Sequence, residues 1–240
     1  LAPADPDQRF GVQPVIQQRK EKIVSSPHSS APQGPMQQDR GRLAMRAGGI
    51  GRALGFLLAI LVALLSYRYV FDLPPVPDVI AANRYRPFWL VLHAGSAATA
   101  LLVGAVQFSA VRRQRKPAVH RWVGRLYVVG CLLGAGSGLV LAVGTSAGPI
   151  AGAGFGSLAV VWIFANALGW QRAIARQFAS HRRWMIRSWA LTLAAVTLRI
   201  YIPLFEIAGL PELAAYRAIS FLCWVPNLLA AELMLRQERR

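Results

Sequence analysis

The 240-residue chain is 55% hydrophobic and only 15% charged, an imbalance that a soluble domain of this length seldom shows. A formal net charge of +17 would suggest a nucleic-acid partner in a soluble protein. The placement of the basic residues along the chain therefore decides between a soluble nucleic-acid-binding protein and a membrane protein. They gather in the segments between long apolar blocks. This placement argues against nucleic acid and predicts a membrane protein.

The first 50 residues differ from the rest of the chain. Residues 1–50 are rich in Pro, Gln, Ser and Arg with almost no apolar periodicity, which is typical of a disordered basic tail. The chain begins with Leu1, so Met36 and Met45 are candidates for the true start. We expect residues 51–240 to form the transmembrane domain.

Six apolar blocks follow, each near the ~20 residues that a helix needs to cross a bilayer. They cover Arg52–Phe71, Pro87–Val111, Trp122–Thr145, Gly148–Trp170, Trp184–Pro203 and Ala214–Leu235. Helices and closed barrels are the structures that can span a bilayer, and these blocks lack the alternation of barrel strands. We therefore predict an all-α integral membrane bundle of six transmembrane helices.

Basic residues fall mainly on one side of such a bundle. They stand before span one, between spans two and three, between spans four and five, and after span six (Arg40, Arg42, Arg46, Arg52; Arg112, Arg113, Arg115, Lys116, Arg121; Arg172, Arg176, Arg182, Arg183; Arg236, Arg239, Arg240). The opposite loops carry fewer basic residues, mixed with acidic ones. The positive-inside rule then places both termini in the cytoplasm.

Two short segments nearly repeat each other, H-R-W-V-G-R at His120–Arg125 and H-R-R-W-M-I-R at His181–Arg187. Each opens a span that returns from the cytoplasmic side, so spans two–three and four–five are predicted to form a parallel internal repeat. Aligning the two tryptophans superposes Arg125 on Arg187. The histidines then differ by one residue, which is about 100° of helix rotation.

Three interpretations of this pair stay open. The two histidines, His120 and His181, are suitable axial ligands for a b-type haem, with Arg125 and Arg187 near its propionates. Alternatively, the His, Arg and Trp side chains form a basic cytoplasmic mouth that binds anionic lipid head groups, a partner or a small ligand. The third interpretation is plain anchoring at the interface. Apart from haem iron, we expect no metal.

The acid in the cytoplasmic half of the predicted bundle is Glu232 on span six. Arg125 and Arg187 lie inside the spans, so each must reach the interface or find a partner. A structural pairing of Glu232 with one of these arginines and a role in binding a substrate or proton are both open.

Three more polar residues lie within predicted spans, His93 and Arg199 in the outer half and Asn227 on span six. His93 shares a face with small residues, so it either has a functional role or is a neutral histidine bonded to a neighbouring helix. It has no histidine opposite it on span four, so a second bis-histidine haem lacks a ligand. Arg199 requires a partner, for which Glu206 or Asn227 is a candidate.

Small residues recur every four positions at Gly130, Gly134 and Gly138, and again at the start of span four. This spacing lets helix backbones approach closely. It favours tight helix packing over a groove for a flat ligand, and it is compatible with a homodimer.

Several runs together resemble the bacterial domain of unknown function 2306 family of predicted membrane proteins. The resemblance covers residues 87–232 and rests on the segments His93–Phe108, His120–Tyr127, His181–Thr192, Val196–Arg199 and Cys223–Glu232. The family implies a multi-pass protein of the bacterial inner membrane without a settled activity. Its outline is also similar to cytochrome b561 bundles, in which paired histidines hold two haems; here only His120 and His181 match one such pair.

Two functions of different classes follow. One is a membrane protein that binds lipid, a membrane-complex partner or a small ligand at its cytoplasmic mouth. The other is a haem electron-transfer protein with His120 and His181 as ligands. The sequence contains no nucleophile–base pair, phosphate loop or carboxylate cluster that would place it in a familiar enzyme class.

Overall fold

The computed structural model describes residues 35–107 and 116–238. The chain divides into two compact units, Leu1–Ile50 and Gly51–Arg240. Helix α2 (Pro35–Ser66) is followed by a turn of 3-10 helix, η1 (Tyr67–Tyr69). The second unit is helical throughout its described secondary structure and contains no strand there.

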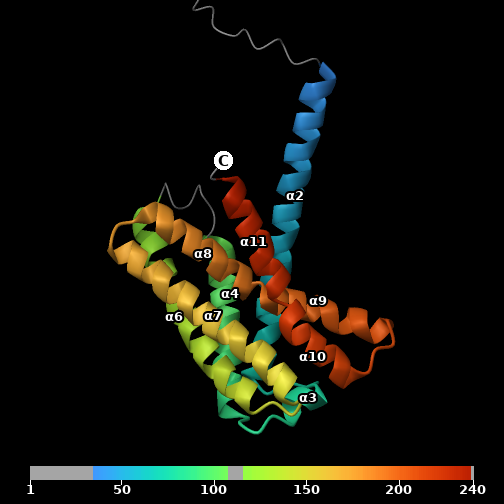
Figure 1. Cartoon of the computed structure of the whole chain (residues 1–240). Coiled ribbons are helices and arrows are strands. Elements are labelled where there is room, and N and C mark those ends of the chain that lie inside the picture. Colours follow the sequence, from blue (N-terminus) through green and yellow to red (C-terminus); the bar gives the residue numbers. More distant parts are fainter. Residues whose placement is uncertain (1–34, 108–115, 239–240) are drawn as a thin grey trace, which may run out of the picture. The chain divides into compact units, whose positions relative to one another are not determined.

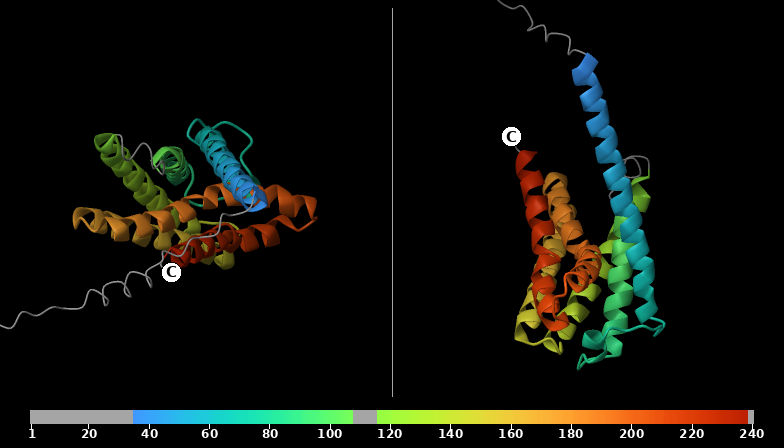
Figure 2. Two further views of the ribbon diagram at one scale, coloured as in Figure 1. Left: turned by 90° about the horizontal axis from the view of Figure 1, so that it is seen from above. Right: turned by 90° about the vertical axis from the view of Figure 1, so that its right-hand side faces the viewer.

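Within the described residues, the second unit continues with the short helix α3 (Asp78–Ala81) and then seven longer helices (Figure 1). These are α4 (Phe88–Gln107), α6 (Pro117–Val143), α7 (Pro149–Ile174), α8 (Phe178–Thr192), α9 (Ala194–Ile207), α10 (Glu212–Leu222) and α11 (Val225–Gln237). α4, α6, α7 and α8 pack in chain order, and α11 returns to pack on α8. α9 and α10 lie side by side as a hairpin (Figure 2).

Five helical stretches in the described residues are long and apolar enough to cross a membrane, counting α8 with α9 and α10 with α11 as single stretches. The expected first span, Arg52–Phe71, corresponds to a shorter apolar helix, Ala53–Tyr69. Many large apolar side chains on the outer surface are exposed, as expected of helices that face lipid. The prediction of an all-helical membrane protein is confirmed.

The last two expected spans differ from the structure in their limits. The fifth was expected from Trp184, but α8 already begins at Phe178 because the basic segment before Trp184 is helical. This stretch is interrupted at Leu193, and the sixth is interrupted at Cys223 and Trp224, where Pro226 stands in the first turn of α11. Proline fits a first helical turn because its nitrogen donates no hydrogen bond there.

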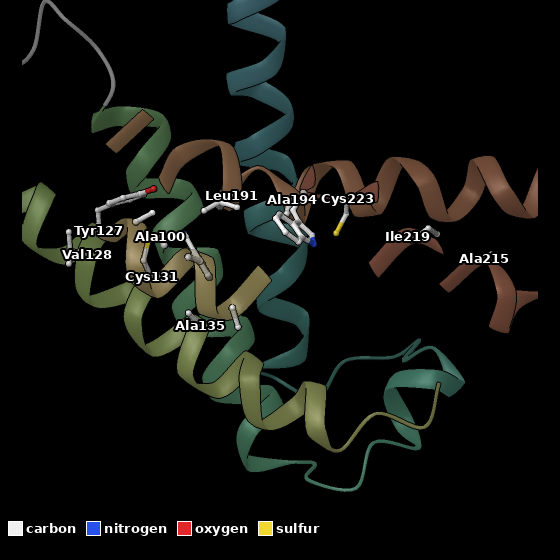
Figure 3. Close-up of a cluster of buried hydrophobic side chains, with 14 residues drawn as sticks. Ala100, Tyr127, Val128, Cys131, Ala135, Leu191, Ala194, Ala215, Ile219 and Cys223 are labelled. Atoms are coloured by element: carbon white, nitrogen blue, oxygen red, sulfur yellow. The ribbon is translucent and has the colours of Figure 1, made fainter. Parts of the chain in front are cut away.

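The glycine stripe of α6 lies against α4. A Cβ atom on Gly130 would stand 3.0 Å from the carbonyl oxygen of Ser96, and one on Gly134 would stand 3.4 Å from the Cα atom of Ala97. The expectation of tight helix packing therefore agrees with the structure. The main buried cluster extends from this contact through Tyr127 and Cys131 to the other helices (Figure 3).

Candidate functional site

The two Trp-x-x-Arg elements adopt the same local arrangement on α6 and α8. The guanidinium carbon of Arg125 lies 4.7 Å from the ring centroid of Trp122, and that of Arg187 lies 4.7 Å from the ring centroid of Trp184. Each arginine is therefore stacked on the tryptophan one helical turn before it, within the range of a cation–π interaction. Both elements belong to the end of the unit where α6 and α8 begin, called here the histidine end (Figure 1).

The surroundings of the two arginines differ. Arg125 is exposed and lies on the outer stripe of α6, whose other members are largely exposed apolar residues (Trp122, Leu126, Val129, Leu133). The Trp122 side chain itself is 69% exposed. Within the described part of the chain, no carboxylate pairs with Arg125. Arg125 thus faces the surroundings of the bundle with its charge uncompensated by the described residues.

Arg187 instead faces Glu232 of α11. Its Nε and Nη2 atoms donate to the two carboxylate oxygens, the Nη2–Oε2 distance being 2.9 Å. The side chains are 17% and 32% exposed, so this two-pronged ion pair is shielded from water. Of the two arginines that the sequence left open, Arg187 is the partner of Glu232.

Two further contacts join α8 to α11. Arg182 donates to both carboxylate oxygens of Glu238, at 2.5 and 2.8 Å, and the Asn227 side chain donates to the Ala190 carbonyl at 3.3 Å. The hydrogen bond from Arg182 holds the pKa of the exposed Glu238 carboxyl below its ordinary value, with charge attraction adding and desolvation opposing. The residue numbers of the three pairs run in opposite directions, as antiparallel helices require. We call this set the α8–α11 ladder.

A second set of contacts, the α7–α8 ladder, lies inside the bundle. The His181 Nδ1–H donates to the Gly169 backbone carbonyl at 2.8 Å. The Ser188 hydroxyl donates to Oδ1 of the Asn166 side chain at 3.0 Å, and the Trp162 indole donates to the Thr192 hydroxyl at 3.1 Å. Ser188, Asn166 and Thr192 are at most 3% exposed. Because their polar atoms are bonded, their burial carries no large desolvation penalty.

Tyr127 joins α6 to this ladder. Its hydroxyl lies 2.8 Å from the Ser188 oxygen and 2.9 Å from the Thr192 oxygen. The Ser188 proton is directed to Asn166 and the Thr192 proton to the Ser188 carbonyl, so the Tyr127 hydroxyl is the donor in this cluster. Tyr127 is only 1% exposed and its hydroxyl closes the polar core of the unit.

These contacts also relate the two histidines. His120 precedes Tyr127 by seven residues, and His181 precedes Ser188 by seven, so each lies about 10 Å along its helix from the Tyr127–Ser188 contact. Both are half-buried in the first turns of their helices. The backbone carbonyl of His120 accepts a hydrogen bond from the Gln107 side chain at 2.8 Å.

Of the residues at the histidine end, His181 fits a role in binding a b-type haem and Arg187 does not. A metal-bound histidine commonly donates its second ring nitrogen to a carbonyl, as His181 does to Gly169, which leaves Nε2 for a ligand. Arg187, however, is already neutralised by Glu232, so it offers no free charge to a propionate. Within the described residues, no group of three or more His, Cys, Asp and Glu side chains is placed to hold a metal ion.

The remaining candidate residues lie away from the histidine end. The His93 Nδ1–H donates to the Gly134 carbonyl of α6 at 2.8 Å, the bond to a neighbouring helix that was one of its two interpretations. Arg199 contacts neither Glu206 nor Asn227, and donates to the Ala195 carbonyl and to Ser66 instead. Asn227 also donates to Thr197 at 2.8 Å and to the Cys223 carbonyl.

The sequence interpretation missed the α7–α8 ladder. Ser188 and Thr192 stand four residues apart on α8, and Asn166 is a lone amide in an apolar run, so a polar residue on a predicted span was the available signal. Their pairing was not visible, because it depends on how two antiparallel helices are aligned.

The helices, the apolar outer surface and the bonded polar core together define a helical membrane protein. The chain belongs to the family described as "Predicted membrane protein (DUF2306)", whose model matches residues 90–235, more than half of its length. This match confirms the expected family. No curated protein and no solved structure matches the chain.

The shielded pair Arg187–Glu232 gives a test of the α8–α11 ladder. Arg187→Met or Glu232→Met alone is expected to lower the free energy of unfolding by about 1–3 kcal/mol, because the partner is left as a poorly solvated unpaired charge. The double variant Arg187→Met/Glu232→Met removes both charges and should return to within about 1 kcal/mol of the native protein. The measurement is detergent-based unfolding followed by circular dichroism.

The more exposed pair Arg182–Glu238 is the matched control, since its side chains are 49% and 40% exposed. Its double-mutant cycle should give a coupling of about 1 kcal/mol or less. Equal couplings at the two pairs, or a double variant of Arg187 and Glu232 as unstable as the sum of its single variants, contradict this account.

Proposed function

We propose that the chain is a multi-pass protein of the bacterial cytoplasmic membrane whose histidine end binds anionic lipid head groups. The observation that carries the proposal is the state of Arg125. It is an exposed guanidinium, stacked on an exposed tryptophan and flanked by apolar side chains that face outward. Tryptophan and arginine in this combination are typical of the level at which lipid head groups meet the hydrocarbon core.

The chemistry of Arg125 supports a phosphate ligand. A guanidinium presents several donors in a planar fork that matches phosphate oxygens, and stacking on Trp122 holds this fork in place. A lipid phosphate beside Arg125 would supply the counter-charge that Glu232 supplies to Arg187. The neighbouring basic residues Lys116 and Arg121, both exposed, would add long-range attraction to an anionic leaflet.

The proposal includes six spans with both termini in the cytoplasm. The apolar helix Ala53–Tyr69 has 17 residues, the lower limit for a crossing, so it serves as the first of the six. The histidine end then lies on the cytoplasmic side, in agreement with the basic loops of the sequence. The similar Trp-x-x-Arg elements support an internal repeat of α4–α6 with α7–α8.

Reporter fusions test this topology. An enzyme reporter active only in the cytoplasm and one active only outside it, fused in turn to each terminus of the full chain, should both report cytoplasmic ends. Opposite locations of the two termini mean an odd number of spans and reject the six-span arrangement.

The lipid proposal is tested by Arg125→Gln. Loss of one charged hydrogen-bonding group is expected to weaken retention of phosphatidylglycerol by roughly 10-fold, as measured by native mass spectrometry of the purified full-length protein. Trp122→Leu should weaken it to a smaller extent, because the guanidinium stays but loses its support.

Arg121→Gln is the matched control, since it removes the same charge from an exposed position of the same helix without a tryptophan stack. It should cause only a small loss. Equal losses in Arg121→Gln and Arg125→Gln indicate unspecific attraction, and unchanged retention in Arg125→Gln rejects the head-group site.

A b-type haem between His120 and His181 is the second candidate, favoured by the bond from His181 to Gly169 and by the equal distance of both histidines from the Tyr127–Ser188 contact. Protein purified from haem-sufficient cells should then show a Soret band and a reduced-minus-oxidised α band, both lost in His120→Ala/His181→Ala. His93→Ala, which removes a histidine bonded elsewhere, should keep them. A folded, colourless protein rejects this candidate.

A further inference from the structure

A second cation without a carboxylate lies at the end opposite the histidine end, where α2 finishes. The Arg199 Nη1 donates to the Ala195 carbonyl of its own helix at 2.9 Å, and its Nη2 donates to the Ser66 hydroxyl at 2.7 Å. Ser66 is 6% exposed and is the last residue of α2. Both partners are neutral, so they orient the guanidinium without balancing its charge.

Arg68 lies two residues after Ser66, the residue whose hydroxyl accepts from Arg199. Its Nη2 donates to the Tyr69 hydroxyl at 2.8 Å, and its guanidinium carbon lies 4.8 Å from the Tyr69 ring centroid. Arg68 and Tyr69 both lie within electrostatic range of Arg199, and so does His93 on α4. Among residues 35–107 and 116–238, no aspartate or glutamate pairs with either arginine.

This arrangement is unfavourable as it stands. Two guanidinium groups repel each other. Charged side chains within membrane helices pair with an opposite charge or mark a binding site. The Tyr69 hydroxyl accepts from Arg68 and keeps its own proton as a further donor. The cluster therefore contains donors and positive charge without an acceptor of matching charge.

We propose that Arg199, Arg68 and Tyr69 form a binding site for a phosphate oxyanion. A tetrahedral phosphate has enough oxygens to accept from two guanidinium groups and a phenol at once, and guanidinium groups match its geometry. Ser66 ends α2 and η1 follows it, so the site lies at the boundary of the apolar helix Ala53–Tyr69 rather than at its centre. A lipid head group and a free phosphate both reach such a position. This site is separate from the one proposed at Arg125.

The test compares two probes on the purified full-length protein. Thermal unfolding is followed with increasing inorganic phosphate, in which chloride keeps the ionic strength constant, and with increasing short-chain phosphatidylglycerol against phosphatidylcholine. Native protein should be stabilised in a saturable way by at least one probe. Arg199→Gln and Arg68→Gln should each raise the half-saturating concentration about 10-fold or more.

Arg84→Gln is the matched control, because Arg84 lies in the loop between α3 and α4 and is paired with an aromatic ring, 5.9 Å from the Tyr85 centroid. It should leave the half-saturating concentration unchanged. If Arg199→Gln fails to fold for want of its bond to Ser66, Arg68→Gln decides alone.

Stabilisation by phosphatidylglycerol alone identifies the ligand as a head group, and stabilisation by inorganic phosphate as well identifies a free anion; both support the site. Absence of saturable stabilisation by either probe overturns it. Equal effects of Arg68→Gln and Arg84→Gln overturn it too, since the anion would then be responding to overall charge.

Discussion

The structure depends on the fixation of α8 by polar contacts on two of its faces. Inside an apolar bundle no water replaces a missing hydrogen bond, so a pair of polar groups specifies one alignment of two helices and penalises every other. The α7–α8 ladder uses His181, Ser188 and Thr192 for this purpose, and the α8–α11 ladder uses Arg182, Arg187 and Ala190. Tyr127 then ties α6 to the same helix, so three neighbours are aligned on α8.

This position of α8 explains why two similar sequence elements have different surroundings. The stacking of arginine on tryptophan is a local property of the Trp-x-x-Arg spacing on a helix, and it is the same on α6 and α8. What the arginine meets next depends on the neighbours. α11 packs on α8 and brings Glu232 to Arg187, whereas the stripe of α6 that holds Arg125 is covered by none of the described helices. The similarity between the two segments therefore extends to local geometry, whereas the partners of the two arginines differ.

Composition along the chain predicted apolar helices and a membrane protein, and the resemblance of several short segments predicted the family. Helix limits were predicted less well, since the fifth span was expected to begin at Trp184 whereas α8 begins at Phe178. The sequence could not predict which polar residues pair between helices, because these pairs depend on how the helices are aligned in the fold. Glu232 was recognised as a partner for an arginine, but only the packing of α11 on α8 selects Arg187, and the pairing of Asn166 with Ser188 has no signal in either segment alone.

The excess of basic over acidic residues divides the arginines into those paired with a carboxylate and those without one. With 27 basic and 10 acidic residues, most arginines cannot have a carboxylate of their own. In the described part, two of the acids, Glu232 and Glu238, form ion pairs with arginines of α8. Both ion pairs hold α8 against α11. No described carboxylate pairs with Arg125 or Arg199. Arg125 stacks on the indole ring of Trp122, and Arg199 donates to the Ser66 hydroxyl. These contacts orient each guanidinium group but do not neutralise its charge. A bilayer is rich in phosphate at both surfaces, so under the two proposed binding sites the membrane itself would be the source of the counter-charges.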